Sequence, residues 1–150
     1  MRERFSILAR SILIGWAMLL AISYLLLRPL LIWTAPRLGP SWFPTTQLSL
    51  ECAVLAGTGW LVGHLNRSGA VVGVVVFAAT LTPWDFGQVL GINVPSLVRL
   101  TADAFRDPRY FDSLIATAGA HALLFGSLIV GGLWRRLSRT EPLSIVGSDP

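Results

Sequence analysis

Three ionisable side chains interrupt the apolar stretches of this sequence and are the first candidates for chemistry: Glu51, His64 and His121. A carboxyl or imidazole group inside a membrane can carry a proton, hydrogen-bond a neighbouring helix or line an ion path. Glu51 is expected in the first turns of its helix, where it can reach water, Arg28 or Arg37. His64 is expected near the end of the same helix, where a positive charge is favourable, so it needs no special role. Glu51 and His121 therefore form the candidate intramembrane polar site.

His121 is the deeper of these two candidates. It lies about eight residues into the last apolar stretch, roughly 12 Å along a helix and near the middle of a hydrocarbon core of about 30 Å. Lipid offers no partner for the donor and the acceptor of a neutral imidazole. We therefore expect His121 to be buried against the hairpin of residues 47–84, bonded to a hydroxyl group, a carbonyl group or Glu51. This structural role is preferred to a proton or metal site.

No other pattern in the sequence indicates a cofactor, a metal site or a catalytic triad. Two histidines, the single Cys52 and one glutamate in apolar stretches match no metal-ligand spacing, and one cysteine excludes an internal disulfide. The tripeptide at 85–87 matches the magnesium-binding motif of kinases, but the glycine-rich loop and the strand lysine are missing. The glycosylation sequon at 66–68 falls in a tight turn, and the arginine cluster at 135–138 is typical of the charges that follow a membrane span. We expect no cofactor and no metal, and catalytic activity is not predicted.

The composition indicates a membrane protein rather than a soluble domain. Of the 150 residues, 53% are hydrophobic and only 13% are charged, whereas soluble domains have roughly 25% charged residues. The apolar residues form long blocks, which favours a single polytopic membrane domain of the all-α class. All 12 basic residues are arginines, and they do not form the basic stripe that nucleic-acid binding requires. The expected partners are the lipid bilayer and either another membrane protein or a second copy of the chain.

The elements that must position these residues are four transmembrane helices in one bundle, predicted at about 7–32, 47–65, 69–84 and 113–134. The first apolar run is longer than the roughly 7–15 residues of a signal-peptide core, and no small-residue cleavage site follows it. We therefore interpret it as an uncleaved span. Residues 34–46 hold three prolines and a glycine and are predicted to form a loop, with Thr45 or Thr46 as the cap of the second helix.

A short amphipathic helix is predicted between the third and fourth spans, at Ser96–Arg106, with Ser96 as its N-cap. Its apolar and charged residues fall on different sides at helical spacing. The helix is therefore expected to lie flat on the membrane surface, with Leu97 and Phe105 toward lipid or the bundle. The polar tail at 140–150 is expected to be mobile.

The arginines also predict how the chain is oriented. Four spans place both termini on one side, which then carries seven arginines against five on the other. The seven are Arg2, Arg4, Arg10, Arg67, Arg135, Arg136 and Arg139. Because they lie close to the helix ends, where the rule is strongest, we predict a multi-pass protein of the cell inner membrane with both termini in the cytoplasm.

Small residues recur at a spacing of four and predict where helices approach closely. The pattern occurs at Gly59 and Gly63, at Gly69 and Gly73, and at Ala118, Ala122 and Gly126. Such spacing is common by chance in glycine-rich spans. These stripes are therefore expected to serve packing within the chain rather than a separate dimer face.

The favoured hypothesis is a small membrane protein with a structural or accessory role in assembly and without catalytic activity. The first alternative is a transporter or channel component whose polar path passes Glu51 and His121. Hydroxyl groups of Thr80, Thr82 and Thr117 would also line that path. The second alternative is a small enzyme that acts on lipid at the outer face through loop carboxylates. Those carboxylates belong to Asp85, Asp103, Asp107 and Asp112.

Overall fold

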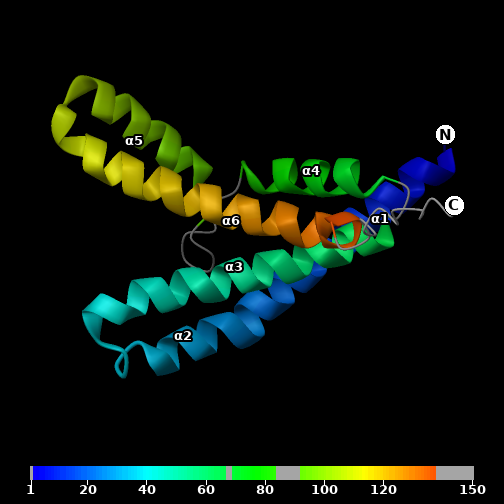
Figure 1. Ribbon diagram of the computed structural model, residues 1–150, viewed down its shortest axis with the longest axis horizontal. Coiled ribbons are helices and arrows are strands. Elements are labelled where there is room, and N and C mark those ends of the chain that lie inside the picture. The colour runs from blue at the N-terminus through cyan, green and yellow to red at the C-terminus, as the bar shows by residue number, and fades with distance from the viewer. Residues whose placement is uncertain (1, 67–68, 84–91, 138–150) are drawn as a thin grey trace, which may run out of the picture.

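A computed structural model shows an all-helical chain and describes residues 2–66, 69–83 and 92–137 (Figure 1). In chain order the elements are α1 (Arg2–Ile22), η1 (Ser23–Leu27), α2 (Arg28–Thr34), α3 (Gly39–Leu65), α4 (Ala70–Leu81), α5 (Val94–Arg106), η2 (Pro108–Tyr110) and α6 (Phe111–Leu137). Three helical stretches are long and apolar enough to cross a membrane: Arg4–Thr34, Gly39–Leu65 and Pro108–Trp134. The all-helical prediction is confirmed. The tripeptide at 85–87, the sequon residues 67–68 and the tail at 140–150 lie outside the described residues.

The first helical stretch is continuous from α1 through α2 but widens at η1. There the N–H of Arg28 donates to the carbonyl of Ser23, five residues back instead of four. Pro29 supplies the physical reason, because it has no N–H and its ring would collide with the carbonyl four residues earlier. A π-turn placed just before the proline relieves this collision, so the helix continues as α2.

Helix α3 begins earlier than the sequence predicted. The loop expected at 34–46 is helical from Gly39 onward, which corrects both the loop and the cap expected at Thr45 or Thr46. Pro40 lies in the first turn, where the missing N–H has no intrahelical partner to lose. Pro44 lies inside the helix and removes only one backbone hydrogen bond. The earlier start places Glu51 roughly 18 Å into the helix instead of in its first turns.

Helices α3 and α6 run parallel and in backbone contact. A Cβ atom on Gly59 would meet the carbonyl of Leu128, and one on Gly63 would meet the carbonyl of Gly132. The two contacts have the same separation in sequence, so the helices point the same way, as Figure 1 shows. On the opposite helix, a Cβ on Gly131 would meet the carbonyl of Ala56. This seam depends on the absence of side chains on both helices.

The remaining core is built where α1 and α4 pack on this pair. Gly15 of α1 lies against Val62 of α3 and Phe77 of α4. The Phe77 ring is fully buried and meets Trp16 edge to face, with ring centroids 6.3 Å apart. The other fully buried apolar side chains extend this core along the bundle and are Leu19, Leu55, Leu81, Val74, Ile92, Leu124 and Leu128.

The chain returns from the end of α3 to the start of α6 in two pieces. Helix α4 has 12 residues, which is roughly 18 Å and shorter than a hydrocarbon core of about 30 Å. The third predicted span, at 69–84, is therefore not a full-length helix within the described residues. In Figure 1, α4 runs back along about half of α6, and α5 then follows the other half.

The predicted amphipathic helix exists as α5 and pairs with the first half of α6. Its N-cap is Asn93 rather than Ser96, because the Asn93 side chain accepts a hydrogen bond from the N–H of Ser96 at 2.8 Å. The buried side chain of α5 is Ala104, whereas Val98 and Phe105 are exposed on its outer face. Together α5 and α6 form an arm that diverges from the α2–α3 turn in Figure 1.

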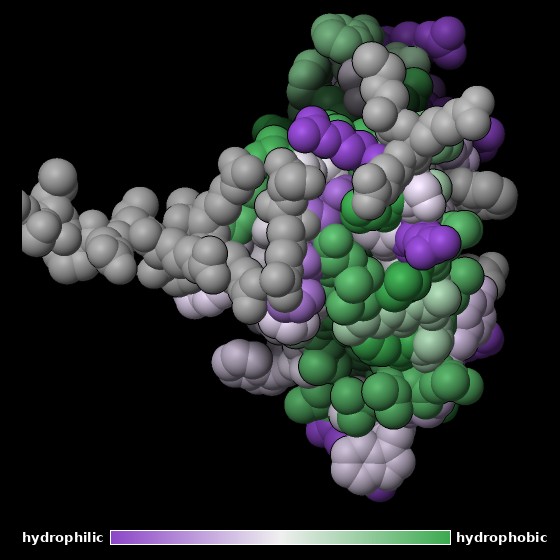
Figure 2. Space-filling view, turned by 90° about the vertical axis from the view of Figure 1, so that its right-hand side faces the viewer, coloured by the Kyte–Doolittle hydropathy of each residue, from purple (hydrophilic) through white to green (hydrophobic). Residues whose placement is uncertain are grey.

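The molecule therefore has two halves along its long axis. The start of α1, the α3–α4 turn and the end of α6 share one end, which we call the terminal half. The α2–α3 and α5–α6 turns lie at the other end, which we call the loop half. Figure 2 views the terminal end and shows hydrophobic residues over its lower part, with hydrophilic residues gathered above. Large exposed apolar side chains follow the helices, among them Leu13, Leu25, Ile32, Ile115 and Leu123.

Candidate functional site

Glu51 and His121 are both buried, but the structure gives them separate partners. Glu51 is 2% exposed and His121 is 6% exposed. The side-chain amide of Gln47 donates to Oε1 of Glu51 at 2.8 Å. The imidazole of His121 is bonded instead to groups of α6 and of the segment before α5. The two residues expected to share one polar site are therefore held in different local networks.

The arginines expected to pair with Glu51 are occupied elsewhere or exposed. Arg37 donates to the carbonyl of Trp33, and its guanidinium lies 3.7 Å from the centre of the Trp33 ring. Arg28 is exposed at the start of α2. Because α3 begins at Gly39, Glu51 lies in mid-helix, and a neutral amide one turn earlier is its partner among the described residues.

His121 has two hydrogen bonds that account for both ring nitrogens. Its Nε2 accepts from the backbone N–H of Asn93 at 3.0 Å. Its Nδ1 lies 2.8 Å from the carbonyl of Thr117, one turn earlier in α6. An N–H can only donate and a carbonyl can only accept, so the proton of the neutral ring is on Nδ1. The expected carbonyl partner is present, but it belongs to α6 itself, and the second partner belongs to the start of α5 rather than to the hairpin at 47–84.

Among the hydroxyl groups expected along a polar path, those of Thr80 and Thr82 are hydrogen-bonded within the chain. Thr80 accepts from the indole N–H of Trp16 at 2.9 Å and donates to the carbonyl of Phe77. Thr82 donates to the carbonyl of Ala79 and is exposed. Thr117 contributes its carbonyl to His121. All three threonines therefore take part in hydrogen bonds within the chain.

Two buried polar side chains that the sequence analysis missed tie the α3–α4 turn to α1. The side-chain N–H₂ of Asn66 donates to the hydroxyl of Ser11 at 3.4 Å, and Ser11 donates to the carbonyl of Leu8. The Asn66 side chain also fills the space beside Gly73. A polar residue directly after a long apolar run was the available signal for Asn66. Nothing local distinguishes Ser11 from the other hydroxyl residues of the spans.

Ser23 is a third buried polar side chain, and it lies at the π-turn. It is 0% exposed, and its hydroxyl has no hydrogen-bond partner. The contacts of Gly15 with Val62 and of Gly59 with Leu128 fix the relative heights of α1, α3 and α6. If each helix is extended straight from these contacts, Ser23, Glu51 and His121 lie at similar positions along the long axis of the bundle. They are then within about one helical turn of each other, roughly 5 Å.

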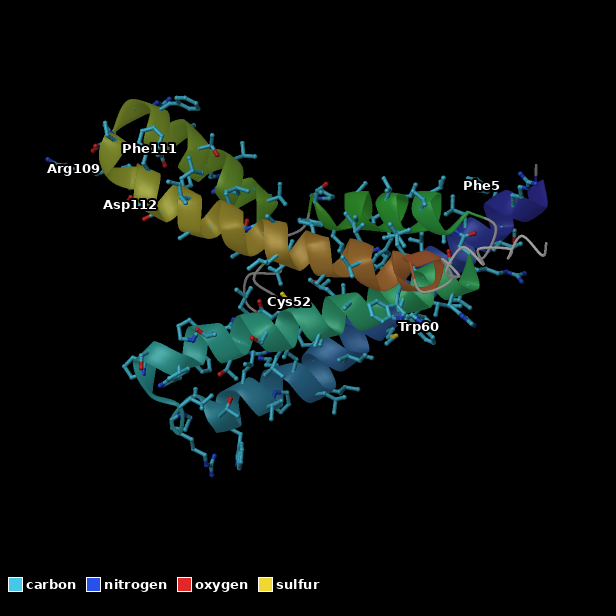
Figure 3. The ribbon with its side chains drawn as sticks, in the orientation of Figure 1. Phe5, Cys52, Trp60, Arg109, Phe111 and Asp112 are labelled. Atoms are coloured by element: carbon cyan, nitrogen blue, oxygen red, sulfur yellow. The ribbon has the colours of Figure 1, made fainter. Side chains whose placement is uncertain are left out.

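Although these three groups lie at similar positions along the bundle axis, they do not belong to the same helix–helix interface. The stripe of α3 that contacts α6 contains Ala56, Gly59 and Gly63, and Cys52 continues it one turn earlier. Figure 3 shows Cys52 on the side of α3 that faces α6. Glu51 continues the neighbouring stripe through Leu55 and Val62, which packs toward α1. Glu51 and His121 therefore border two different helix interfaces.

The predicted packing residues are used unequally. Gly59 and Gly63 are in backbone contact with α6, and Gly73 lies against Asn66. A Cβ on Gly69 would have only the Asn66 oxygen within reach, at 4.0 Å. On α6, a Cβ on Gly126 would meet nothing within 4 Å, Ala122 is exposed and Ala118 is half-buried. The contact face of α6 is instead the one that carries His121, Leu124, Leu128, Gly131 and Gly132.

The loop carboxylates show no shared site among the described residues. Asp103 and Asp112 are exposed. Asp107 accepts from the backbone N–H of Arg109 at 3.0 Å and so caps η2. Figure 3 shows Arg109 and Asp112 at the tip of the α5–α6 turn, far from Cys52. Asp85 lies outside the described residues, within which no group of three or more metal-ligating side chains is found.

Comparison of the chain with protein-family models, with curated proteins and with solved structures gives no match. Its function must therefore be inferred from the geometry of the chain itself.

Proposed function

We propose that this chain is a multi-pass membrane protein with a structural or accessory role in the assembly of a membrane complex, and that it is not an enzyme. The observation that carries the proposal is the backbone contact between α3 and α6 at Gly59 and Gly63. This seam leaves no room for a ligand or a pore between α3 and α6. The buried Asn66 and His121 and the half-buried Thr80 have partners within the chain.

The parallel course of α3 and α6 supports four membrane crossings. If both helices cross the bilayer in the same direction, the chain between them must cross back. Helix α4 is too short to do this alone. We propose that α4 and α5 complete the crossing together, as two helices that follow the two halves of α6 inside protein contacts.

The two ends of the bundle support an orientation with both termini in the cytoplasm of the cell. The terminal end carries Arg4 and Arg10 at the start of α1 and receives the end of α6. At the loop end, α5 carries Arg99, Asp103 and Arg106 beside the exposed Phe105. Arg106, in the last turn of α5, reaches the α5–α6 turn, where its charge suits the headgroup region at the outer face of the inner membrane.

Cysteine labelling tests this topology. With Cys52 replaced by alanine, a single cysteine at Ser6 should react only after the membrane is opened, whereas one at Ser113, beside the α5–α6 turn, should react on intact cells. Both serines are exposed, so burial does not limit the reaction. External reaction at Ser6 would contradict the proposed orientation.

An uncovered stripe on α6 supports an assembly partner, which is either another membrane protein or a second copy. Gly119, Ala122 and Gly126 share this face, and a Cβ on either glycine would meet nothing within 4 Å. A glycine inside a helix costs about 1 kcal/mol relative to alanine, and no contact with the part of the chain that the structure describes explains this cost.

Co-purification in a mild detergent, after crosslinking in the membrane, tests the assembly role. We expect one defined partner, or a defined oligomer, that is lost when Gly126 is replaced by leucine. The matched control is Gly57→Leu on α3, where a Cβ also meets nothing within 4 Å. A monomer that crosslinks to nothing would contradict the role.

Transport remains the second candidate because of the unexpected depth of Glu51. A carboxyl group that is 2% exposed in mid-helix, at the height of the unpartnered hydroxyl of Ser23, is an arrangement found along proton and ion pathways. Vesicles that contain the purified protein test this candidate. A proton or cation flux that Glu51→Gln abolishes, and that Ser49→Ala leaves intact, would favour transport over assembly.

A further inference from the structure

Helix α5 is attached to the rest of the molecule by apolar contacts, including the fully buried Ile92 just before the helix, and by one hydrogen bond to His121. It packs on α6, and Ala104 is its buried side chain. Its outer face is open, with Phe105 82% exposed. At its start, the backbone N–H of Asn93 is donated to Nε2 of His121. Since His121 is buried and α5 is mostly exposed, this bond is the polar anchor of the helix.

The anchor depends on the protonation state of the imidazole. Nδ1 carries the proton that is donated to the carbonyl of Thr117, which leaves Nε2 as an acceptor for Asn93. A second proton would have to bind to Nε2. Two N–H groups would then point at each other, and the hydrogen bond to Asn93 would be lost.

The position of the ring at the start of α5 adds to this effect. The N-terminus of a helix carries a partial positive charge from its aligned peptide dipoles. A positive imidazolium beside Asn93, the N-cap of α5, is therefore repelled by the helix that the neutral ring anchors. Both consequences of protonation act in the same direction.

We propose that His121 is an acid-sensitive latch, and that protonation of its imidazole releases the start of α5 from α6. The released helix keeps its own cap, because Asn93 accepts from Ser96 through its side chain rather than through the atoms that bind His121. The expected change is therefore an undocking of an intact helix, and it does not depend on the assembly role proposed above.

The charged and titratable groups around the latch come from every element packed on α6. Helix α3 brings Glu51 and Cys52 to the height of His121 and carries His64 at its far end, while α4 contains no such group. Helix α5, η2 and α6 bring charges on exposed side chains, namely Arg99, Asp103, Arg106, Arg109 and Asp112. Among these groups, Glu51 is the one that is buried at the height of the ring.

Hydrogen exchange of the full-length protein in lipid nanodiscs tests the latch. The quantity compared is the protection factor of the backbone amides of α5, that is, the exchange rate relative to an unstructured peptide at the same pH. Between about pH 8 and about pH 5, where a histidine gains its charge, protection of α5 should fall by roughly tenfold, the scale of one lost interhelical hydrogen bond. Protection of α3 should not change.

Three variants separate the latch from a general effect of acid. His121→Gln retains an acceptor but cannot be charged, so α5 should stay protected at both pH values. His121→Leu has no acceptor, so α5 should be poorly protected at both. His64→Leu removes the other histidine, which stacks on Trp60 at the opposite end of α3, and should respond to pH like the wild type.

The wild-type measurement alone can overturn the proposal. Unchanged protection of α5 across this pH range shows that no latch exists, whatever the folding of the variants. A fall that persists in His121→Gln shows that another group is responsible. Glu51→Gln then identifies whether that group is the buried carboxylate, because it would abolish the pH response.

Discussion

The two halves of the molecule are held together in different ways. In the terminal half, helices touch through backbone atoms at Gly59, Gly63 and Gly131. In the loop half, α5 is held by the buried side chains of Ala104 and of Ile92 just before the helix, and by a hydrogen bond to His121. Small residues permit contact along a whole seam and leave no alternative arrangement, whereas a single hydrogen bond can be broken without disturbing the rest. A rigid half and a releasable half follow from this difference.

The largest effect should come from a side chain placed in the glycine seam. Gly59→Val puts atoms where the carbonyl of Leu128 lies, and backbone cannot move aside as a side chain can. We expect a loss of about 3 kcal/mol in unfolding free energy, at the upper end of overpacking effects. The measurement is reversible unfolding in mixed micelles. Gly57→Val is the control on the same helix, since nothing lies within 4 Å of that position. Equal losses in the two variants would show that the seam is not the source of rigidity.

The next effect should come from the polar tie at the terminal end. Asn66→Ala removes the side-chain bond to Ser11 and the atoms beside Gly73. Leaving a buried hydroxyl partly unpaired should cost about 1–2 kcal/mol. Ser49→Ala, which alters an exposed hydroxyl of α3, should cost less than about 0.5 kcal/mol. If Asn66→Ala leaves the unfolding free energy unchanged, the stability of this half comes from glycine packing alone.

The third effect lies in the loop half and should be local. His121→Leu removes the anchor of α5 and should lower the unfolding free energy by roughly 1 kcal/mol, the size of an interhelical hydrogen bond in a membrane. Proteolysis should become faster within α5 and remain unchanged in α3. Uniform acceleration along the chain would contradict the division into two halves. A fully stable variant that has lost a measured flux would instead favour transport.

Apolar block length was sufficient to predict the all-helical fold, and three of the four predicted spans correspond to long apolar helices among the described residues. The start of α3 could not be predicted, because proline signals a break in general but is tolerated in a first turn, as at Pro40. The short length of α4 could not be predicted, because an apolar sequence does not indicate the residue at which its helix ends.

The candidate site was predicted only in part. Burial of His121 followed from its depth, but its partner Asn93 lies 28 residues away in sequence, and only tertiary structure selects it. The contact face of α6 was also not determined by a spacing of four. Two overlapping stripes satisfy that spacing, and the bulky Leu124 and Leu128 decide which one turns inward.

The smallest effect concerns the face of α6 that the chain leaves open. Gly126→Ala adds a methyl group where nothing lies within 4 Å, and it improves helix propensity. For the isolated chain we therefore expect a gain of about 0.5 kcal/mol or slightly more in unfolding free energy. If a partner helix occupies this face in the membrane, the same methyl group should weaken the complex, because close approach requires the glycine. The isolated protein and the crosslinked complex should then respond with opposite signs. A gain in both would show that the open face contacts lipid alone and that any assembly partner binds elsewhere.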